Sequence, residues 1–159
     1  MILFLDFDGV LHPYPCMTRQ YFCQLPLMER ILRGFPGVEI VISSAWRLRF
    51  SDQNEALLQM RKHFSPDIAE RVVGTTPDHR DRPRSEAPPG LGEFLREWEC
   101  LSWLRENRPA GTAWLALDDQ PGLFTPDCAD LMLTSFKTGF RVGNGWVFCE
   151  HLKQRGGGR

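Results

Sequence analysis

A chain of 159 residues, of which 42% are hydrophobic, fits one folded domain with a single core. Its formal net charge of -1 excludes a strong overall attraction to nucleic acid or to an anionic membrane, and leaves room only for a local basic patch. Five cysteines without a CxxC spacing indicate reduced thiols in a cytoplasmic protein, and argue against a disulfide framework or a zinc site.

The first half of the chain alternates apolar strands with amphipathic helices. The apolar run over residues 1–7 predicts a strand buried on both faces, as in a parallel sheet. It is far too short for a membrane span or a signal-peptide core, so no membrane partner is expected. Further helices and strands are predicted in the order helix, strand, helix, strand over residues 24–33, 38–42, 52–64 and 71–73.

The second half begins with a long loop over residues 75–92, which are rich in Pro, Gly, Asp and Arg. A helix and two strands are predicted after it, over residues 93–106, 113–117 and 130–133. The run Gly143-Asn144-Gly145 predicts a hairpin turn within residues 139–148. We expect one domain over residues 1–152, followed by a disordered tail over residues 153–159.

Three predicted strands end in polar residues. These are Asp6 and Asp8, Ser43 and Ser44, and Asp118 and Asp119. Strands that alternate with helices indicate an α/β fold, here a single doubly wound, Rossmann-like domain of three layers with a mainly parallel sheet. Ligands of such sheets bind beyond the carboxyl ends of the strands, so these residues are expected to meet at one edge.

The carboxylates at this edge favour a bound cation. Asp6 and Asp8 lie two positions apart on an extended segment, so both can face one crevice, and Gly9 allows a sharp turn. Carboxylates brought together need a cation, and oxygen ligands without His or Cys favour Mg²⁺. One carboxylate can then attack phosphorus while another moves protons. The pattern indicates a magnesium-dependent phosphohydrolase that acts on a phosphorylated substrate.

The run Asp6-Phe7-Asp8-Gly9-Val10-Leu11 resembles DxDGx[VT], the first motif of the haloacid dehalogenase-like (HAD) superfamily. The resemblance extends over about residues 1–140. It implies that Asp6 is the nucleophile and a metal ligand. It also implies that Asp8 is the general acid and base, with its backbone carbonyl on the metal.

The second and fourth motifs of the superfamily are matched at two later strand ends. Ser43 resembles the second motif, which binds the phosphoryl group, and Ser44 is the alternative one residue further on. Asp118-Asp119 resembles the fourth, metal-binding motif. Comparison with the commoner GD form of that motif implies that Asp119 is the main ligand and Asp118 its neighbour.

The third motif is a Lys or Arg near the start of a helix. The resemblance points to Arg96, with Lys62, Arg84 and Arg61 as competing candidates. Arg47, which follows Ser44-Ala45-Trp46, can also reach a substrate phosphate, and a surface role for it is equally compatible with the sequence.

HAD proteins often carry a cap domain after the first or third strand, and residues 11–24 and 75–92 are too short for one. The resemblance therefore implies a capless protein, and capless members often act on bulky or macromolecular phosphoesters. Some small bacterial HAD domains that resemble this chain are associated with RNA repair, so a nucleotide or a nucleic acid end is a candidate substrate. A catalytically weak HAD-like module that binds without turnover is the alternative. The sequence leaves the oligomeric state open.

Overall fold

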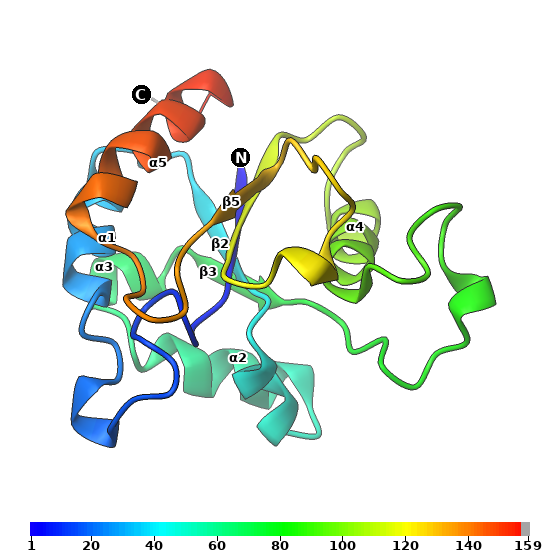
Figure 1. Ribbon diagram of the computed structural model, residues 1–159, viewed down its shortest axis with the longest axis horizontal. Helices are drawn as coiled ribbons and strands as arrows, with labels where there is room; N and C mark the ends of the chain where they lie inside the picture. The colour runs from blue at the N-terminus through cyan, green and yellow to red at the C-terminus, as the bar shows by residue number, and fades with distance from the viewer. Residues whose placement is uncertain (157–159) are drawn as a thin grey trace.

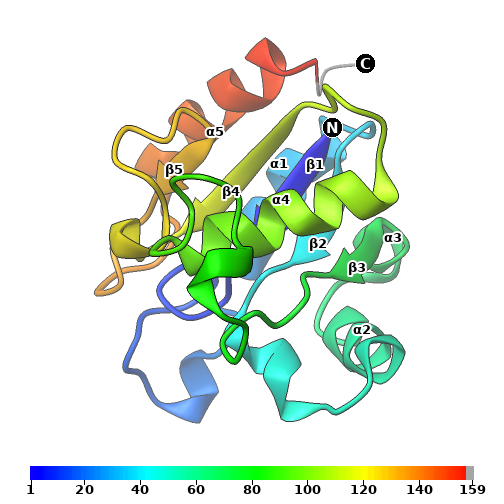
Figure 2. The same ribbon diagram turned by 90° about the vertical axis from the view of Figure 1, so that its right-hand side faces the viewer.

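The computed structural model describes residues 1–156 and contains a five-stranded sheet covered by helices on both faces (Figures 1 and 2). The strands lie in the order β3-β2-β1-β4-β5, and every neighbouring pair is parallel. Their bounds are Ile2–Leu5 (β1), Glu39–Ile42 (β2), Val72–Thr75 (β3), Trp114–Asp118 (β4) and Leu131–Leu133 (β5). The predicted α/β, Rossmann-like fold with a parallel sheet is confirmed.

The described part of the chain has five α-helices beside the sheet: Leu25–Arg33 (α1), Gln53–Arg61 (α2), Pro66–Ala69 (α3), Leu95–Asn107 (α4) and Val142–Gln154 (α5). Figure 2 shows α4 lying across one face of the sheet. The other α-helices contribute side chains to the core on the opposite face. The helices thus form the two outer layers of a three-layer domain.

The central strand β1 contributes side chains to the cores on both faces of the sheet, because successive side chains of a strand point to opposite faces. Leu3 and Leu5 join the core under α1 and α5, while Ile2 and Phe4 pack in the core under α4. All four side chains are buried, and each contributes about 1.5–3 kcal/mol by leaving water. Strong burial on both sides fixes the end of β1, where Asp6 follows.

The connections after β1 and β3 contain little regular secondary structure. Within residues 1–156, the first contains the 3-10 turn η1 (Thr18–Gln20) and the second contains η3 (Arg84–Glu86). Neither segment forms a separate cap domain. The edge of the sheet beyond β1 and β4 is therefore left without a covering domain.

The predicted hairpin within residues 139–148 is wrong, because Gly143-Asn144-Gly145 lies in the first turns of α5. The Asn144 side chain accepts a hydrogen bond from the Arg141 N–H at 2.8 Å, which caps the start of this helix. Phe148 and Leu152, four residues apart, are buried on one face of the helix. A side chain at Gly145 would lie 3.0 Å from Ile31, so glycine here allows α5 to approach α1.

The tail predicted over residues 153–159 begins inside the last helix, α5. Lys153 and Gln154 end α5. Arg155 donates hydrogen bonds to the backbone oxygens of Trp114 and Ala129 and to the Asp130 carboxylate. Residues 157–159, the rest of the expected tail, lie outside the described residues. None of the helices described is long and apolar enough to cross a membrane.

Candidate active site

The register of the sheet brings three strand ends together. Leu5 of β1 pairs with Ile42 of β2 and with Leu117 of β4, so the residues that follow them lie side by side. The Asp6 N–H donates to the Leu117 oxygen at 3.1 Å, and the Ser43 N–H donates to the Leu5 oxygen at 3.0 Å. The polar strand ends therefore converge at one edge, as the sequence predicts.

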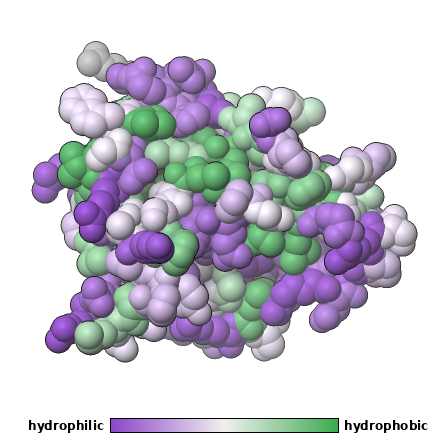
Figure 3. All heavy atoms as spheres, viewed as in Figure 1, coloured by the Kyte–Doolittle hydropathy of each residue, from purple (hydrophilic) through white to green (hydrophobic). Residues whose placement is uncertain are grey.

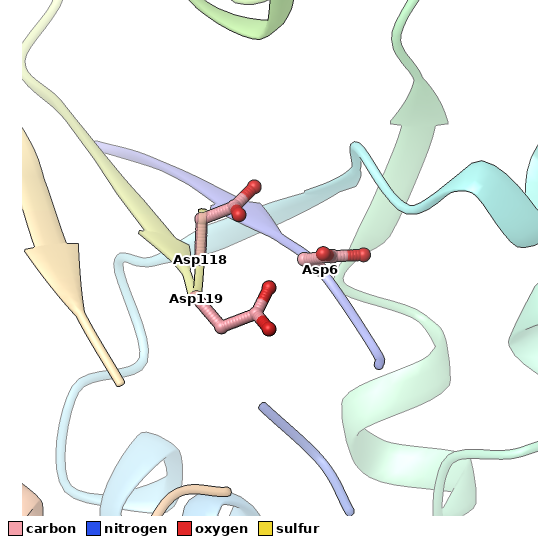
Figure 4. Close-up of side chains that lie close together, drawn as sticks. All are labelled: Asp6, Asp118 and Asp119. Carbon is pink, nitrogen blue, oxygen red and sulfur yellow. The ribbon is translucent and has the colours of Figure 1, made fainter. Parts of the chain in front are cut away.

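Asp6, Asp118 and Asp119 form a three-aspartate cluster, in which one carboxylate oxygen of each lies within 4.8 Å of the others (Figure 4). Asp6 and Asp118 are buried. Burial and the nearby Asp6 carboxylate raise the pKa of Asp118 to about 7, although Arg96 opposes this shift. Burial and Asp6 also raise the pKa of Asp119. The cluster is thus costly as a group of anions and would be stabilised by a cation.

The two neighbouring aspartates have different partners. The Asp118 carboxylate accepts hydrogen bonds from Arg96 Nη1 at 3.0 Å and from the Gln120 N–H at 2.9 Å. The Oδ1 atom of Asp119 is buried and has no hydrogen-bond partner among residues 1–156. Asp119 therefore has the freer carboxylate for a ligand, and the sequence-based choice of Asp119 over Asp118 stays a prediction.

Gly9 is required by the position of Asp119. Its φ angle is +68°, in the left-handed region that favours glycine. A Cβ atom at this position would lie 2.2 Å from Asp119 Oδ2. The glycine of the DxDG run therefore allows the fourth-motif carboxylate to pack directly against the first motif.

The residues present fit a divalent cation. Mg²⁺ would suit an all-oxygen donor set, the raised pKa values and the Asp119 Oδ1 atom, which is buried and lacks a partner within the described residues. Asp8, which was also predicted to bind the metal, does not contribute its carboxylate to this cluster. Its backbone carbonyl, the ligand atom that the family resemblance implies, stays a prediction.

The Asp8 carboxylate is held by two ring N–H groups. Trp46 Nε1 donates to it at 3.0 Å, and His12 Nε2 lies 2.9 Å from it. Because the Phe22 N–H donates to His12 Nδ1 at 3.3 Å, the proton of a neutral His12 is on Nε2, facing Asp8. Burial alone would raise the pKa of Asp8, but these hydrogen bonds outweigh it and lower that pKa below its ordinary value.

Arg96 is the third-motif candidate that the structure brings to the cluster. It is buried in the first turn of α4, and its Nη1 lies 3.0 Å from Asp118 Oδ2 and 3.8 Å from Asp6 Oδ2. The other three candidates have partners elsewhere. Lys62 binds Gln59, Arg84 binds Glu93 and Arg61 binds the Val72 oxygen.

Arg47 is not brought to the cluster as a phosphate-binding group. Its guanidinium is buried and donates five hydrogen bonds, which is the full capacity of the side chain. The acceptors are the backbone oxygens of Ser43, Ser44, Thr76 and Pro77 and the Glu99 carboxylate. Arg47 therefore ties the residues after β2 to those after β3, instead of offering a free cation.

Ser43 and Ser44 differ in what their hydroxyl groups do. The Ser44 hydroxyl accepts from the Trp46 N–H at 3.4 Å and so caps the 3-10 turn η2 (Ala45–Arg49). Ser43 is buried next to Asp6 in the sheet register, and Arg47 holds its backbone oxygen at 2.6 Å. This arrangement favours Ser43 over Ser44 for the predicted contact with a phosphoryl group.

Sequence reasoning assigned no site role to Trp46 or Glu99. Glu99 accepts hydrogen bonds from Arg47 and from the His79 N–H, and lies 3.8 Å from Arg96 Nε. It therefore joins the segment after β2 to Arg96, the candidate for the third motif. The spacing of Arg96 and Glu99, one helical turn apart on α4, is a sequence signal that could have indicated this contact. The contact between Trp46 and Asp8 depends on tertiary structure and has no such signal.

The sheet order, the strand-end aspartates and the neighbouring Arg96 define a Rossmann-like domain of the HAD class. Residues 2–143 match the family described as the HAD domain in Swiss Army Knife RNA repair proteins, and the chain belongs to this family. No curated protein and no solved structure matches the sequence.

Proposed function

We propose that this domain is a Mg²⁺-dependent phosphomonoesterase that acts through an aspartyl-phosphate on Asp6. The observation that carries the proposal is the three-aspartate cluster with Arg96 beside it, because its carboxylate oxygens lie within 4.8 Å of one another and a buried guanidinium adjoins them. Mg²⁺ held by Asp6 and Asp119, with Asp118 beside them, would neutralise charge that develops on the phosphoryl oxygens.

In the first step, a carboxylate oxygen of Asp6 attacks phosphorus and the bond from phosphorus to the leaving oxygen breaks. Asp6 Oδ1 accepts a hydrogen bond from the Phe7 N–H at 2.8 Å, which fixes the carboxylate at the end of β1. The leaving oxygen takes a proton from the carboxyl group of Asp8. Arg96 and the Ser43 hydroxyl bind the phosphoryl oxygens and hold the group in line for attack.

In the second step, the Asp8 carboxylate takes a proton from water, and the water oxygen attacks phosphorus. Phosphate leaves, and the Asp6 carboxylate is restored together with the protonated Asp8. The hydrogen bonds from Trp46 and His12 favour the ionised form of Asp8, which this second step requires, and disfavour the protonated form that gives up its proton in the first step. They also fix the direction in which the carboxylate faces.

We infer that the substrate is the phosphorylated end of a nucleic acid. The family is described by its occurrence in RNA repair proteins, and repair of a broken strand requires its ends to carry the correct groups. The connections after β1 and β3 contain only short turns, so a polymer end can reach the cluster.

The test is phosphate release from aryl phosphate, nucleotides and RNA or DNA with a phosphate at the 3′ or 5′ end, with Mg²⁺ and with a chelator. Asp6→Asn should lower the rate by on the order of 10³-fold or more, because the variant lacks the nucleophile. Asp81→Asn, at an exposed position of the loop after β3, is the matched control. Release that survives in Asp6→Asn would overturn the mechanism, and no release from any substrate would favour a binding module.

A further inference from the structure

A surface cavity lies against the three-aspartate cluster on the side of β5. It has a volume of about 650 Å³, and Asp119 forms part of its wall together with the residues of the 3-10 turn η4 (Pro121–Leu123). Tyr14 and Phe136 also line it. This volume is within the range of small-ligand sites. Because the cavity shares Asp119 with the cluster, a group bound there would adjoin a phosphoryl group on Asp6.

The two aromatic side chains of this cavity are exposed. Tyr14 has 55% and Phe136 has 48% of its surface accessible. The segments that carry them are joined, since the Tyr14 N–H donates to the Phe136 oxygen at 2.7 Å and the Phe140 N–H donates to the Val10 oxygen at 2.7 Å. The rings therefore stand on a fixed backbone, although neither is needed to fill the core.

The surroundings favour a planar, polar ligand over a broad apolar partner. Lys137 Nζ lies 5.7 Å from the centre of the Phe136 ring and places a positive charge beside the cavity. Gln120, which also lines the cavity, offers an amide to the edge of a planar ring. Apolar side chains are scattered among polar ones on the face seen in Figure 3, so that face is not a continuous apolar surface.

We propose that Tyr14 and Phe136 form a stacking subsite for the nucleobase of the phosphorylated terminal nucleotide. Every nucleobase has a flat face, so stacking on aromatic rings holds a strand end without selecting its sequence. Lys137 would attract the sugar-phosphate chain that leads away from the base. The proposal rests on the proposed function, because it places the base beside the phosphoryl group that the cluster would attack.

The experiment compares two single-stranded RNA probes, one with an intact phosphorylated end and one whose terminal nucleotide lacks its base. Binding is measured by fluorescence anisotropy in an Asp6→Asn background, which removes turnover, with 3′-phosphate and 5′-phosphate forms of each probe. We expect the intact end to bind about tenfold or more tightly. Tyr14→Ala and Phe136→Ala should each reduce this preference toward equal affinity. Trp146→Ala, an exposed aromatic on α5, should keep it.

Equal affinity for the two probes, or no binding of either, would overturn the subsite. It would also be overturned if Tyr14→Ala or Phe136→Ala weakened both probes by the same factor. Light scattering that shows a dimer abolished by Tyr14→Ala would assign the surface to a second copy of the chain instead. Because binding is measured without turnover, the subsite can stand even where phosphate release fails, and release from small phosphates can stand where the subsite fails.

Discussion

The two sides of the three-aspartate cluster differ in how fully their charged side chains are bonded. On the side of β2, Arg47 uses all five N–H donors, and Glu99 connects it to Arg96. On the side of β5, Asp119 Oδ1 has no partner among residues 1–156, and Tyr14 stands exposed. The first side is built to hold its shape, whereas the second has bonding capacity left for a metal ion and a substrate.

The largest effect is expected from breaking the ion pair between Arg47 and Glu99 on the side of β2. Arg47→Met leaves the Glu99 carboxylate buried without its closest cation, which costs about 3–5 kcal/mol of unfolding free energy. Chemical denaturation measures this loss, and Glu99→Gln in the same chain should restore part of it. Arg49→Met is the matched control, because Arg49 is exposed and lies over the Trp46 ring. An equal loss in both single variants would contradict the distinction between the two sides.

The next effect concerns the cation that the other side would bind. Mg²⁺ at a concentration of about a hundred times its Kd should stabilise the folded protein by about 2.7 kcal/mol. Asp119→Asn removes the freer carboxylate and should abolish most of this gain, as measured by thermal unfolding with Mg²⁺ and with chelator. Asp81→Asn should keep the gain. A gain that persists in Asp119→Asn would place the cation elsewhere.

The same cluster predicts a pH dependence for the metal-free protein. The pKa of Asp118 is raised to about 7 in the folded state, whereas the pKa of an aspartate in an unfolded chain is about 4. Between these values the folded state holds a proton that the unfolded state lacks, so this group makes stability fall as pH rises through the window. The melting temperature in chelator should show this fall in the wild type, and the fall should be smaller in Asp118→Asn.

A smaller effect distinguishes the cost of positive φ at Gly9 from the cost of a steric contact with Asp119. Gly9→Ala and Gly90→Ala both place a side chain at positive φ, which costs about 1–2 kcal/mol. Only the alanine at position 9 meets Asp119, whereas position 90 has open space, so Gly9→Ala should lose about 1–3 kcal/mol more. The thermal shift caused by Mg²⁺ should also fall only in Gly9→Ala. Equal losses and equal shifts would show that Asp119 does not depend on this glycine.

The smallest effect distinguishes the two neighbouring serines. Ser43→Ala should lower kcat/KM about tenfold, because a hydrogen bond to a charged phosphoryl group is lost. Ser44→Ala removes a helix cap and should cost about 0.5–1 kcal/mol of stability, with the smaller effect on turnover. Rates on an aryl phosphate together with denaturation curves measure both. The reverse pattern would assign the phosphoryl contact to Ser44.

Much of the fold follows from local patterns in the sequence. Continuous apolar runs such as residues 2–5 mark strands buried on both faces, and the polar residues after them lie at one edge because all the strands are parallel. The glycines of residues 143–145 led to the wrong prediction of a hairpin turn, because glycine that permits a turn also permits close packing of helices. The burial of Phe148 decides between the two, and burial depends on the whole fold.

The site was less accessible to sequence reasoning where it depends on contacts between distant segments. Arg47 follows the polar end of β2 and Arg96 lies in the first turn of α4, yet Arg47 is enclosed by backbone oxygens and Arg96 lies beside Asp6. The acceptors of Arg47 depend on the position of Thr76 and Pro77, which directly follow β3 and lie beside the residues after β2. Similarly, His12 is near Asp8 in the chain, but the position of its proton depends on the Phe22 N–H.

The attachment of Arg155 has a practical consequence for handling the protein. Arg155 binds the Trp114 oxygen at the start of β4, and the Met1 amino group binds the Gly37 oxygen ahead of β2. Both anchors lie at the edge of the sheet opposite the one that carries the aspartates, as the position of the N-terminus and the end of α5 shows in Figure 1. An affinity tag, a fluorescent label or a surface tether attached next to either anchor would therefore leave the three-aspartate cluster facing solution.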